Sequence, residues 1–116
     1  MSDRNAILME SIKRLLRRNA MQHLRKIVAK THAADLSRVF DSLSLTEQVK
    51  LFSMIDDVEQ KGILFSELEK DTLLDFVEVL KIEEVVAVLE DMPTDDVADI
   101  IGKLPEETAD TILHRM

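Results

Sequence analysis

The sequence has no cysteine, tryptophan or tyrosine, and only two glycines, two prolines and four phenylalanines among its 116 residues. Without cysteine there is no disulfide framework, no thiolate metal site and no cysteine nucleophile. So few glycines and prolines leave little material for the tight turns of an all-β fold. No uncharged apolar run approaches the roughly 18 residues of a membrane-spanning helix. Residues 1–18 lack the uncharged core and small-residue cleavage site of a signal peptide. We therefore expect a soluble, helical chain with an aliphatic core.

Charge is distributed unevenly along the chain. Residues 1–30 carry eight Lys or Arg and two acidic residues, a net charge of +6. Residues 31–116 carry seven Lys or Arg and twenty-one Asp or Glu, a net charge of −14. Such a contrast between segments says more about partners than the total of −8 does. The acidic segment is expected to repel nucleic acid and to attract cations.

A short phrase repeats in the acidic segment. In LEDMPTDDVADIIGKLPEE, Met-Pro and Leu-Pro stand twelve residues apart, and each is followed by acidic and then apolar residues. The same spacing extends back to Leu80 and forward to Met116 and, with one extra residue near Leu68, reaches Ile55 and Leu43. Within each unit the apolar residues recur three and four positions apart, which is typical of an amphipathic helix.

Each unit predicts a helix of roughly two to two and a half turns. Pro93 and Pro105 suit a first helical turn, where a missing N–H costs nothing. SLTE (residues 44–47) and DDVE (residues 56–59) each place a capping residue three positions before a Glu. Such short helices are unstable alone, so pairs of units are expected to form hairpins that stack.

The predicted fold is therefore all-α: a superhelical stack of short helical hairpins, or α-solenoid, with about nine helices. Its inward-facing positions are expected to include Leu36, Phe40, Leu43, Phe52, Leu80, Val85, Leu89, Ile101 and Leu104.

The first 30 residues follow another pattern. Residues 5–18 combine an apolar side with a basic side, and NAMQ (residues 19–22) predicts the cap of a second helix. We interpret residues 1–30 as basic N-terminal helices that pack on an acidic helical-repeat domain of residues 31–116. A basic helix lying on an anionic membrane or on nucleic acid is the less favoured alternative, because the chain lacks Trp and Tyr for anchoring or stacking.

The sequence contains few residues in arrangements that are typical of catalysis. His23, His32 and His114 are far apart in the sequence, and no Ser-centred or Gly-rich phosphate motif accompanies them. Isolated histidines near helix ends are more often surface or capping residues than general bases. We predict a binding protein and not an enzyme, with no catalytic residue.

Asp95, Asp96 and Asp99 form a dense acidic group. Asp95 and Asp99 are four residues apart, so their carboxylates project from one helix face, whereas Asp96 points roughly 100° away. A solvated acidic face stabilised by the helix dipole is one reading. Two like charges four apart are nevertheless destabilising without a counter-charge, and the local sequence offers only Lys103. Mg²⁺, which one or two carboxylates hold while it keeps several waters, would satisfy Asp95 and Asp99.

Three stretches carry a resemblance: THAADLSRVFDSL, SLTEQVKLFSMI and above all LEDMPTDDVADIIGKLPEE. Together they closely resemble the cytoplasmic N domain of MgtE-type magnesium transporters, over residues 20–116. In that family a His-Pro-x-Asp-(Ile/Leu) opening precedes Leu-Pro-Glu-Glu helices at this period. A similar helical-repeat architecture occurs in the flagellar motor-switch protein. The resemblance implies a superhelix of short helices, followed by paired CBS domains, a connecting helix and a transmembrane pore.

The resemblance also implies a mode of action. Mg²⁺ bound between the N domain and CBS domains, of the same or a partner chain, bridges acidic faces and favours the closed pore. At low Mg²⁺ these faces repel and the pore opens. By position, Asp95 and Asp99 match acidic residues of the family's (Pro/Leu)-Asp-Asp-x-Ala-Asp segment. The resemblance implies that this chain is a regulatory Mg²⁺ sensor at the cytoplasmic face of the inner membrane, in a homodimeric transporter. It implies no nucleic-acid partner and no membrane insertion by the chain itself.

Two positions depart from the family pattern. His32-Ala33 replaces His-Pro, which removes only a rigid helix start. Gly62 stands where some members place a Glu that faces the metal interface, so one shared site is expected to be absent or weaker. A free-standing helical-repeat adaptor without metal, like the motor-switch protein, is the alternative function. The reading frame after Met116 separates the two.

Overall fold

In the computed structural model, residues 2–116 are described, and they form nine α-helices and no strand. The first helix, α1 (Ser2–Arg17), has sixteen residues. The others have eight to ten: α2 (Met21–Ala29), α3 (Ala33–Asp41), α4 (Leu45–Phe52), α5 (Val58–Glu67), α6 (Lys70–Val79), α7 (Ile82–Glu90), α8 (Thr94–Lys103) and α9 (Glu106–Arg115). The predicted all-α fold of about nine short helices is confirmed. No helix in the described part of the chain is long and apolar enough to cross a membrane.

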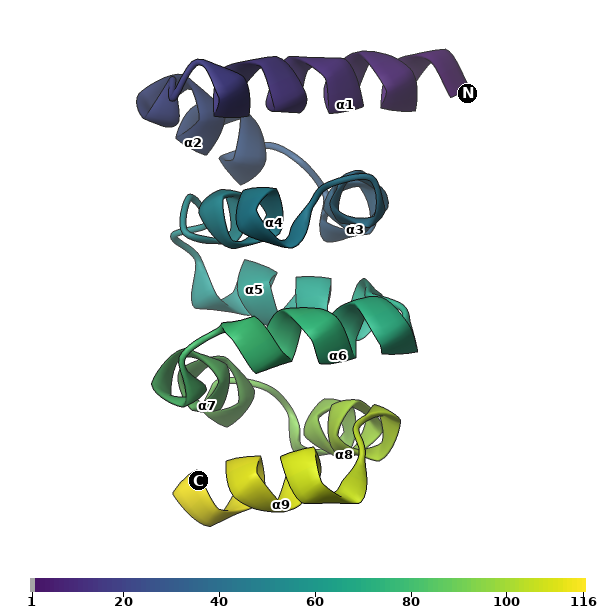
Figure 1. The fold of residues 1–116 in the computed structure, drawn as a ribbon, viewed down its shortest axis with the longest axis vertical. Coiled ribbons are helices and arrows are strands. Elements are labelled where there is room, and N and C mark those ends of the chain that lie inside the picture. The colour runs from purple at the N-terminus through teal and green to yellow at the C-terminus, as the bar shows by residue number, and fades with distance from the viewer. Residues whose placement is uncertain (1) are drawn as a thin grey trace.

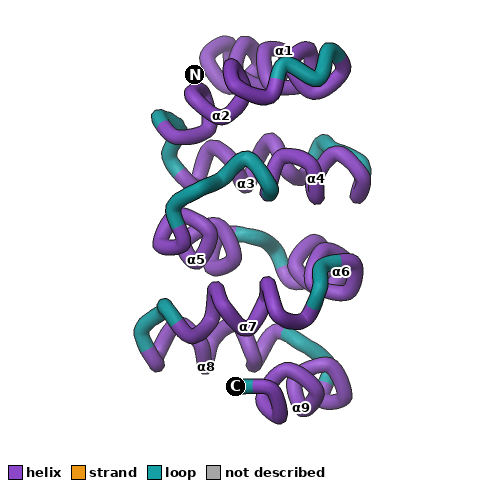
Figure 2. The backbone as a smooth tube through the Cα atoms, turned by 90° about the vertical axis from the view of Figure 1, so that its left-hand side faces the viewer, coloured by secondary structure: helices purple, strands orange, loops and turns teal. Residues whose placement is uncertain are grey.

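The helices are stacked in chain order, with α1 at one end of the molecule and α9 at the other (Figure 1). Most contact the helix two places along the chain: α3 packs on α5, α4 on α6, α5 on α7, and α7 on α9. Seen from the side, α4, α6 and α9 lie along one edge of the stack and α5 and α8 along the other (Figure 2). The structural repeat is therefore a pair of helices, as the sequence period predicts.

The starts of the helices reproduce the sequence period. The N-cap residues of the last seven helices are twelve residues apart, except for one interval of thirteen between α4 and α5. These residues are His32, Ser44, Asp57, Glu69, Lys81, Pro93 and Pro105. The extra residue of the repeat thus lies in the connection before α5 and not near Leu68.

The two predicted capping stretches behave differently. At Ser44 the capping box forms: the N–H of Glu47 donates to Ser44 Oγ (3.2 Å), and the N–H of Ser44 donates to Glu47 Oε1 (3.0 Å). In DDVE the cap is Asp57, one residue later than predicted, and its carboxylate accepts from the N–H of Glu59 (3.0 Å). Asp56 is instead ion-paired with Arg25.

The prolines also stand one position earlier than expected. Pro93 and Pro105 are the N-cap residues of α8 and α9, with extended ψ angles of 146° and 150°. Their carbonyls accept the first helical N–H groups, for example that of Val97 at 3.1 Å from the Pro93 oxygen. The missing proline N–H therefore lies just outside each helix, where it still costs no hydrogen bond.

Asn19 ends α1 and does not cap α2, contrary to the sequence prediction. Its φ of 55° is left-handed, which Asn adopts more readily than most residues. The N–H groups of Asn19 and Ala20 donate to the carbonyls of Leu16 (3.2 Å) and Leu15 (3.0 Å). This is the Schellman arrangement of a helix C-terminus. The N-cap residue of α2 is Ala20, which has no side chain that can cap the helix.

The core follows the inward faces of the stack. All four phenylalanines meet in it, one each from α3, α4, α5 and α6. The ring of Phe76 stands edge-on to Phe40 and Phe52, with centroids 5.3 and 5.1 Å apart, and Phe52 stacks on Phe65 at 5.7 Å. Of the nine predicted core positions, seven are buried and two, Leu80 and Ile101, are half-buried.

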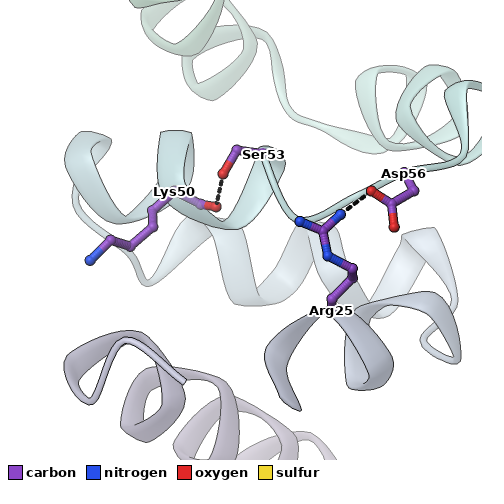
Figure 3. A network of polar contacts seen from close by, with 4 residues as sticks. All are labelled: Arg25, Lys50, Ser53 and Asp56. Carbon is purple, nitrogen blue, oxygen red and sulfur yellow. Dashed lines mark hydrogen bonds and ion pairs between the residues drawn. The ribbon is translucent and has the colours of Figure 1, made fainter. Parts of the chain in front are cut away.

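The first two helices are joined to the others by apolar and polar contacts. α1 packs against α2, α3 and α4, and the inward side chains of α1 and α2 are at most 3% exposed: Ile12, Leu16, Leu24 and Val28. Arg25 of α2 points at Asp56 in the α4–α5 connection (Figure 3). From α5, Gln60 Nε2 donates to the carbonyls of Val28 (2.9 Å) and Thr31 (3.0 Å), at the end of α2.

Candidate functional site

The predicted metal ligands lie on α8. Pro93 leads the chain into this helix, so Asp95 and Asp96 fall in its first turn and Asp99 one turn later. All three side chains are exposed. The four-residue spacing places Asp95 and Asp99 on one face of α8. Their role as metal ligands stays a prediction.

Lys103 does not act as the local counter-charge. Its ammonium group reaches from α8 to the end of α5, where Nζ donates to the carbonyls of Ser66 (3.2 Å) and Leu68 (3.4 Å). A cation is favourable there because the C-terminal carbonyls of a helix carry partial negative charge. No described Lys or Arg forms an ion pair with Asp95 or Asp99. Only water and dissolved ions therefore screen the repulsion between these two carboxylates.

An acidic groove of about 560 Å³ lies between α5 and the connection from α7 to α8. Its apolar lining comes from Gly62, Ile63, Met92 and Pro93, and its polar lining from Ser66, Glu59, Asp91 and Asp96. All three of these carboxylate side chains are exposed. Asp96 thus faces the groove, whereas Asp95 and Asp99 do not line it, which agrees with the different direction predicted for Asp96.

Gly62 has a structural explanation inside this groove. It is buried in α5, and Met92 lies against it: a Cβ added to Gly62 would stand 2.8 Å from Met92 Cγ and 3.1 Å from Met92 Sδ. Contacts this short require Met92 to move. A glutamate at position 62 is therefore incompatible with this packing of Met92, whatever its effect on a metal interface.

Glu59 and Asp91 are the groove residues that sequence reasoning overlooked. Asp91 stands directly before Met92-Pro93 in the repeated phrase, and this position is the sequence feature that could have identified it as a groove residue. Glu59 gives no comparable signal, because only the packing of α5 against α7 and α8 brings it near Asp91. Within residues 4–116, no three His, Asp, Glu or Cys side chains are grouped closely enough to hold a metal ion.

The three histidines are distributed over the stack. His23 lies on α2, His32 is the N-cap residue of α3, and His114 lies on α9, and all three are exposed. The Nδ1 atom of His114 is 3.1 Å from the carbonyl oxygen of Asp110, one turn earlier. Each histidine thus belongs to a different helix or connection.

A stack of paired short helices with exposed charged faces defines a class of protein, the α-solenoid repeat domains, which act by binding through their surfaces. Within that class the family is specific. Residues 31–116 match the family described as the MgtE intracellular N domain, and the chain belongs to it. This confirms the resemblance drawn from the sequence. The members of this family are transport-related domains, and the family is not a known family of enzymes.

The fold has a counterpart among solved structures. The crystal structure of the soluble part of a magnesium transporter is similar to this chain, with a TM-score of 0.85 over 97% of its length. The sequence identity is 16%, so the likeness is one of fold. This chain spans 44% of that chain, less than half its length. A search of curated proteins gave no significant match.

Proposed function

We propose that this chain is a regulatory, Mg²⁺-sensing domain of an MgtE-type magnesium transporter. In this proposal it gates the pore through Mg²⁺-bridged contacts with CBS domains of the same or a partner chain, within a homodimer. The observation that carries the proposal is the family match together with the acidic face of α8, whose Asp95 and Asp99 have no cationic partner among the described residues.

The electrostatics of α8 support a bridging role for the ion. Because Lys103 is held by carbonyls of α5, a second acidic surface approaching Asp95 and Asp99 meets uncompensated negative charge. Mg²⁺ between the two surfaces replaces this repulsion by attraction. Mg²⁺ dehydrates reluctantly and needs six oxygen ligands, so two carboxylates on one helix bind it weakly by themselves. In this proposal the closed arrangement of the domains binds Mg²⁺ more tightly than the open one. Mg²⁺ therefore shifts the equilibrium between open and closed arrangements towards closure, by the difference between its two affinities.

The proposal assigns different parts to the two segments of the chain. Residues 31–116 are the acidic regulatory domain, and residues 1–30 are basic helices packed at its beginning. The domain has no turnover of its own and works at the cytoplasmic face of the inner membrane. The competing function is a free-standing adaptor without metal. Sequencing the reading frame after Met116 separates them, since CBS domains and a transmembrane pore follow only in the transporter.

The test titrates Mg²⁺ into the transporter that carries this domain and follows domain closure by protection from protease. Asp95→Asn with Asp99→Asn is expected to leave the helical circular dichroism unchanged. The midpoint of protection should move to higher Mg²⁺ by about tenfold or more, as expected when two carboxylate ligands are lost.

The chain offers a closely matched control. Asp71 and Asp75 of α6 occupy the same helical positions as Asp95 and Asp99 of α8, and both are exposed. Asp71→Asn with Asp75→Asn removes the same charge and should leave the midpoint in place. Equal shifts from the two pairs would mean that the midpoint depends only on the net charge of the domain. If the α8 substitutions caused no shift, Asp95 and Asp99 would be ordinary solvated side chains and not metal ligands.

A further inference from the structure

A basic surface lies at the end of the stack opposite α9. The exposed Lys and Arg residues of the first two helices and their connection form it, and we call it the basic end: Arg4, Arg14, Arg17, Arg18 and Lys26. Glu10 is the one exposed acidic residue between residues 4 and 30. Arg25 is excluded because Asp56 neutralises it (Figure 3). None of these five basic residues has an ion pair with a described acidic residue.

The orientation of α1 turns this charge away from the body. Ile12 and Leu16 are buried, so residues half a turn away on the helix project outward. Arg14, Arg17 and Arg18 occupy that outward side near the end of α1. Figure 1 shows α1 lying across the end of the stack, with α2 beside its C-terminal half. The basic charge is thus displayed on the terminal layer of the molecule.

We propose that the basic end adsorbs on an anionic phospholipid surface, by electrostatic attraction and without insertion. Arg14, Arg17 and Arg18 project outward from the terminal helix of the stack (Figure 1), where a planar array of phosphates can approach them. Each basic residue near an anionic bilayer raises the partition coefficient by about fivefold. Ile7 is 67% exposed on the same helix, but one aliphatic side chain is no membrane anchor.

Nucleic acid fits this surface less well. All four phenylalanines are buried in the core, each at most 1% exposed, and the chain has no Trp or Tyr. No Phe, Tyr or Trp ring is therefore available to stack on a base, and His23 on α2 is the one exposed imidazole among residues 4–30. The same absence of interfacial aromatic residues makes the proposed membrane contact weak and reversible.

The net charge of −8 does not prevent adsorption, because the molecule is long and its charges are separated. The longest dimension is 39 Å and runs along the stack, with α1 at one end and α8 and α9 at the other. The Debye length at physiological ionic strength is about 8 Å. A lipid surface in contact with α1 is therefore several screening lengths from the acidic helices at the far end. Adsorption through the basic end points α8 and α9 away from the bilayer.

The test measures sedimentation of the 116-residue chain with lipid vesicles, in the presence of a chelator so that Mg²⁺ plays no part. Vesicles of phosphatidylcholine and phosphatidylglycerol in equal amounts should bind the chain at low salt and release it at high salt. Vesicles of phosphatidylcholine alone should not bind it. Arg14→Gln with Arg18→Gln should lower the partition coefficient by about 25-fold, from about fivefold for each charge.

Lys70→Gln with Lys81→Gln is the matched control, because both lysines are exposed on the body and the change in net charge is the same. It should leave binding within a factor of two or so. Absence of binding to anionic vesicles at low salt overturns the proposal, as does equal loss from both pairs of substitutions. Tighter binding to a random oligonucleotide than to vesicles, or self-association abolished by Arg14→Gln with Arg18→Gln, would assign the basic end to nucleic acid or to a second copy instead. None of these outcomes depends on the Mg²⁺ proposal.

Discussion

The two glycines show how differently one residue type can be used in a helical stack. Gly102 lies in the last turn of α8, and a Cβ there would meet nothing within 4 Å. Gly62 lies inside α5 with Met92 packed against it. Glycine costs a helix up to about 1 kcal/mol relative to alanine. Only at Gly62 does close packing offset that cost.

We therefore expect Gly102→Ala to raise the free energy of unfolding by about 0.5–1 kcal/mol. Gly62→Ala should lower it, because the displacement of Met92 outweighs the gain in helix propensity. Urea unfolding of the two variants measures the difference. In a Met92→Ala background, Gly62→Ala should become stabilising, since the two residues are in contact and their effects are coupled. Equal stabilisation by both glycine substitutions in the natural background would show that Met92 moves freely.

Single residues could be predicted where their partners are close in sequence. The capping box of Ser44 could be predicted from the sequence because Glu47 is only three residues away. The roles of Asp56 and Lys103 were not predictable, since their partners are 31 to 37 residues distant. These partners are Arg25 on α2 and the carbonyls of Ser66 and Leu68 at the end of α5. A capping stretch with two adjacent aspartates is ambiguous until a distant arginine takes one of them.

Among the helices, α2 is held to the stack by a feature that invites a test. Gln60 of α5 donates to two carbonyls at the end of α2. Gln60→Met keeps the length of the side chain and removes the donor. We expect a loss of about 1–2 kcal/mol of stability and faster amide hydrogen exchange in residues 21–31.

Exchange in α8 and α9 should be unaffected by Gln60→Met. Gln22→Met, on the exposed side of α2, serves as the control and should change neither quantity. If Gln60→Met left exchange in α2 unaltered, apolar contacts alone would account for the attachment of this helix.

The existence and period of the helices were predictable, because apolar spacing and proline positions are local properties of the sequence. Their exact starts were less so: Pro93 and Pro105 fall one position before the helix, and Asn19 ends a helix where a cap was expected. The acidic groove was beyond prediction, because Glu59 and Asp91 meet only through the packing of α5 on later helices. The acidic face of α8 needed no such packing and was visible in the sequence.

For the molecule as a whole, the effect of a core substitution should depend on its position in the stack. Phe76 contacts three other phenylalanines from three helices, with centroids 5.1–6.3 Å apart. Phe76→Ala should cost about 3–5 kcal/mol and raise hydrogen exchange in every helix from α3 to α7. Ile112→Ala at the end of the stack should cost about 2–5 kcal/mol, with faster exchange confined mainly to α7 and α9.

Hydrogen exchange resolved helix by helix distinguishes these two patterns. The contrast follows from a stack in which most helices contact only near neighbours along the chain. Uniformly faster exchange in α3–α6 after Ile112→Ala would instead show a single cooperative unit.

The pairing of most helices with the second helix along the chain also bears on how the protein is synthesised. A ribosome releases about 5–20 residues per second, so one two-helix repeat takes seconds to emerge. Helix formation and the closure of short loops take microseconds or less. Since α3 packs chiefly on α5, and α5 in turn on α7 and α8, each layer can dock soon after the next helices leave the exit tunnel. The unfinished chain exposes the apolar face of one repeat at a time, and synthesis itself sets the order of assembly.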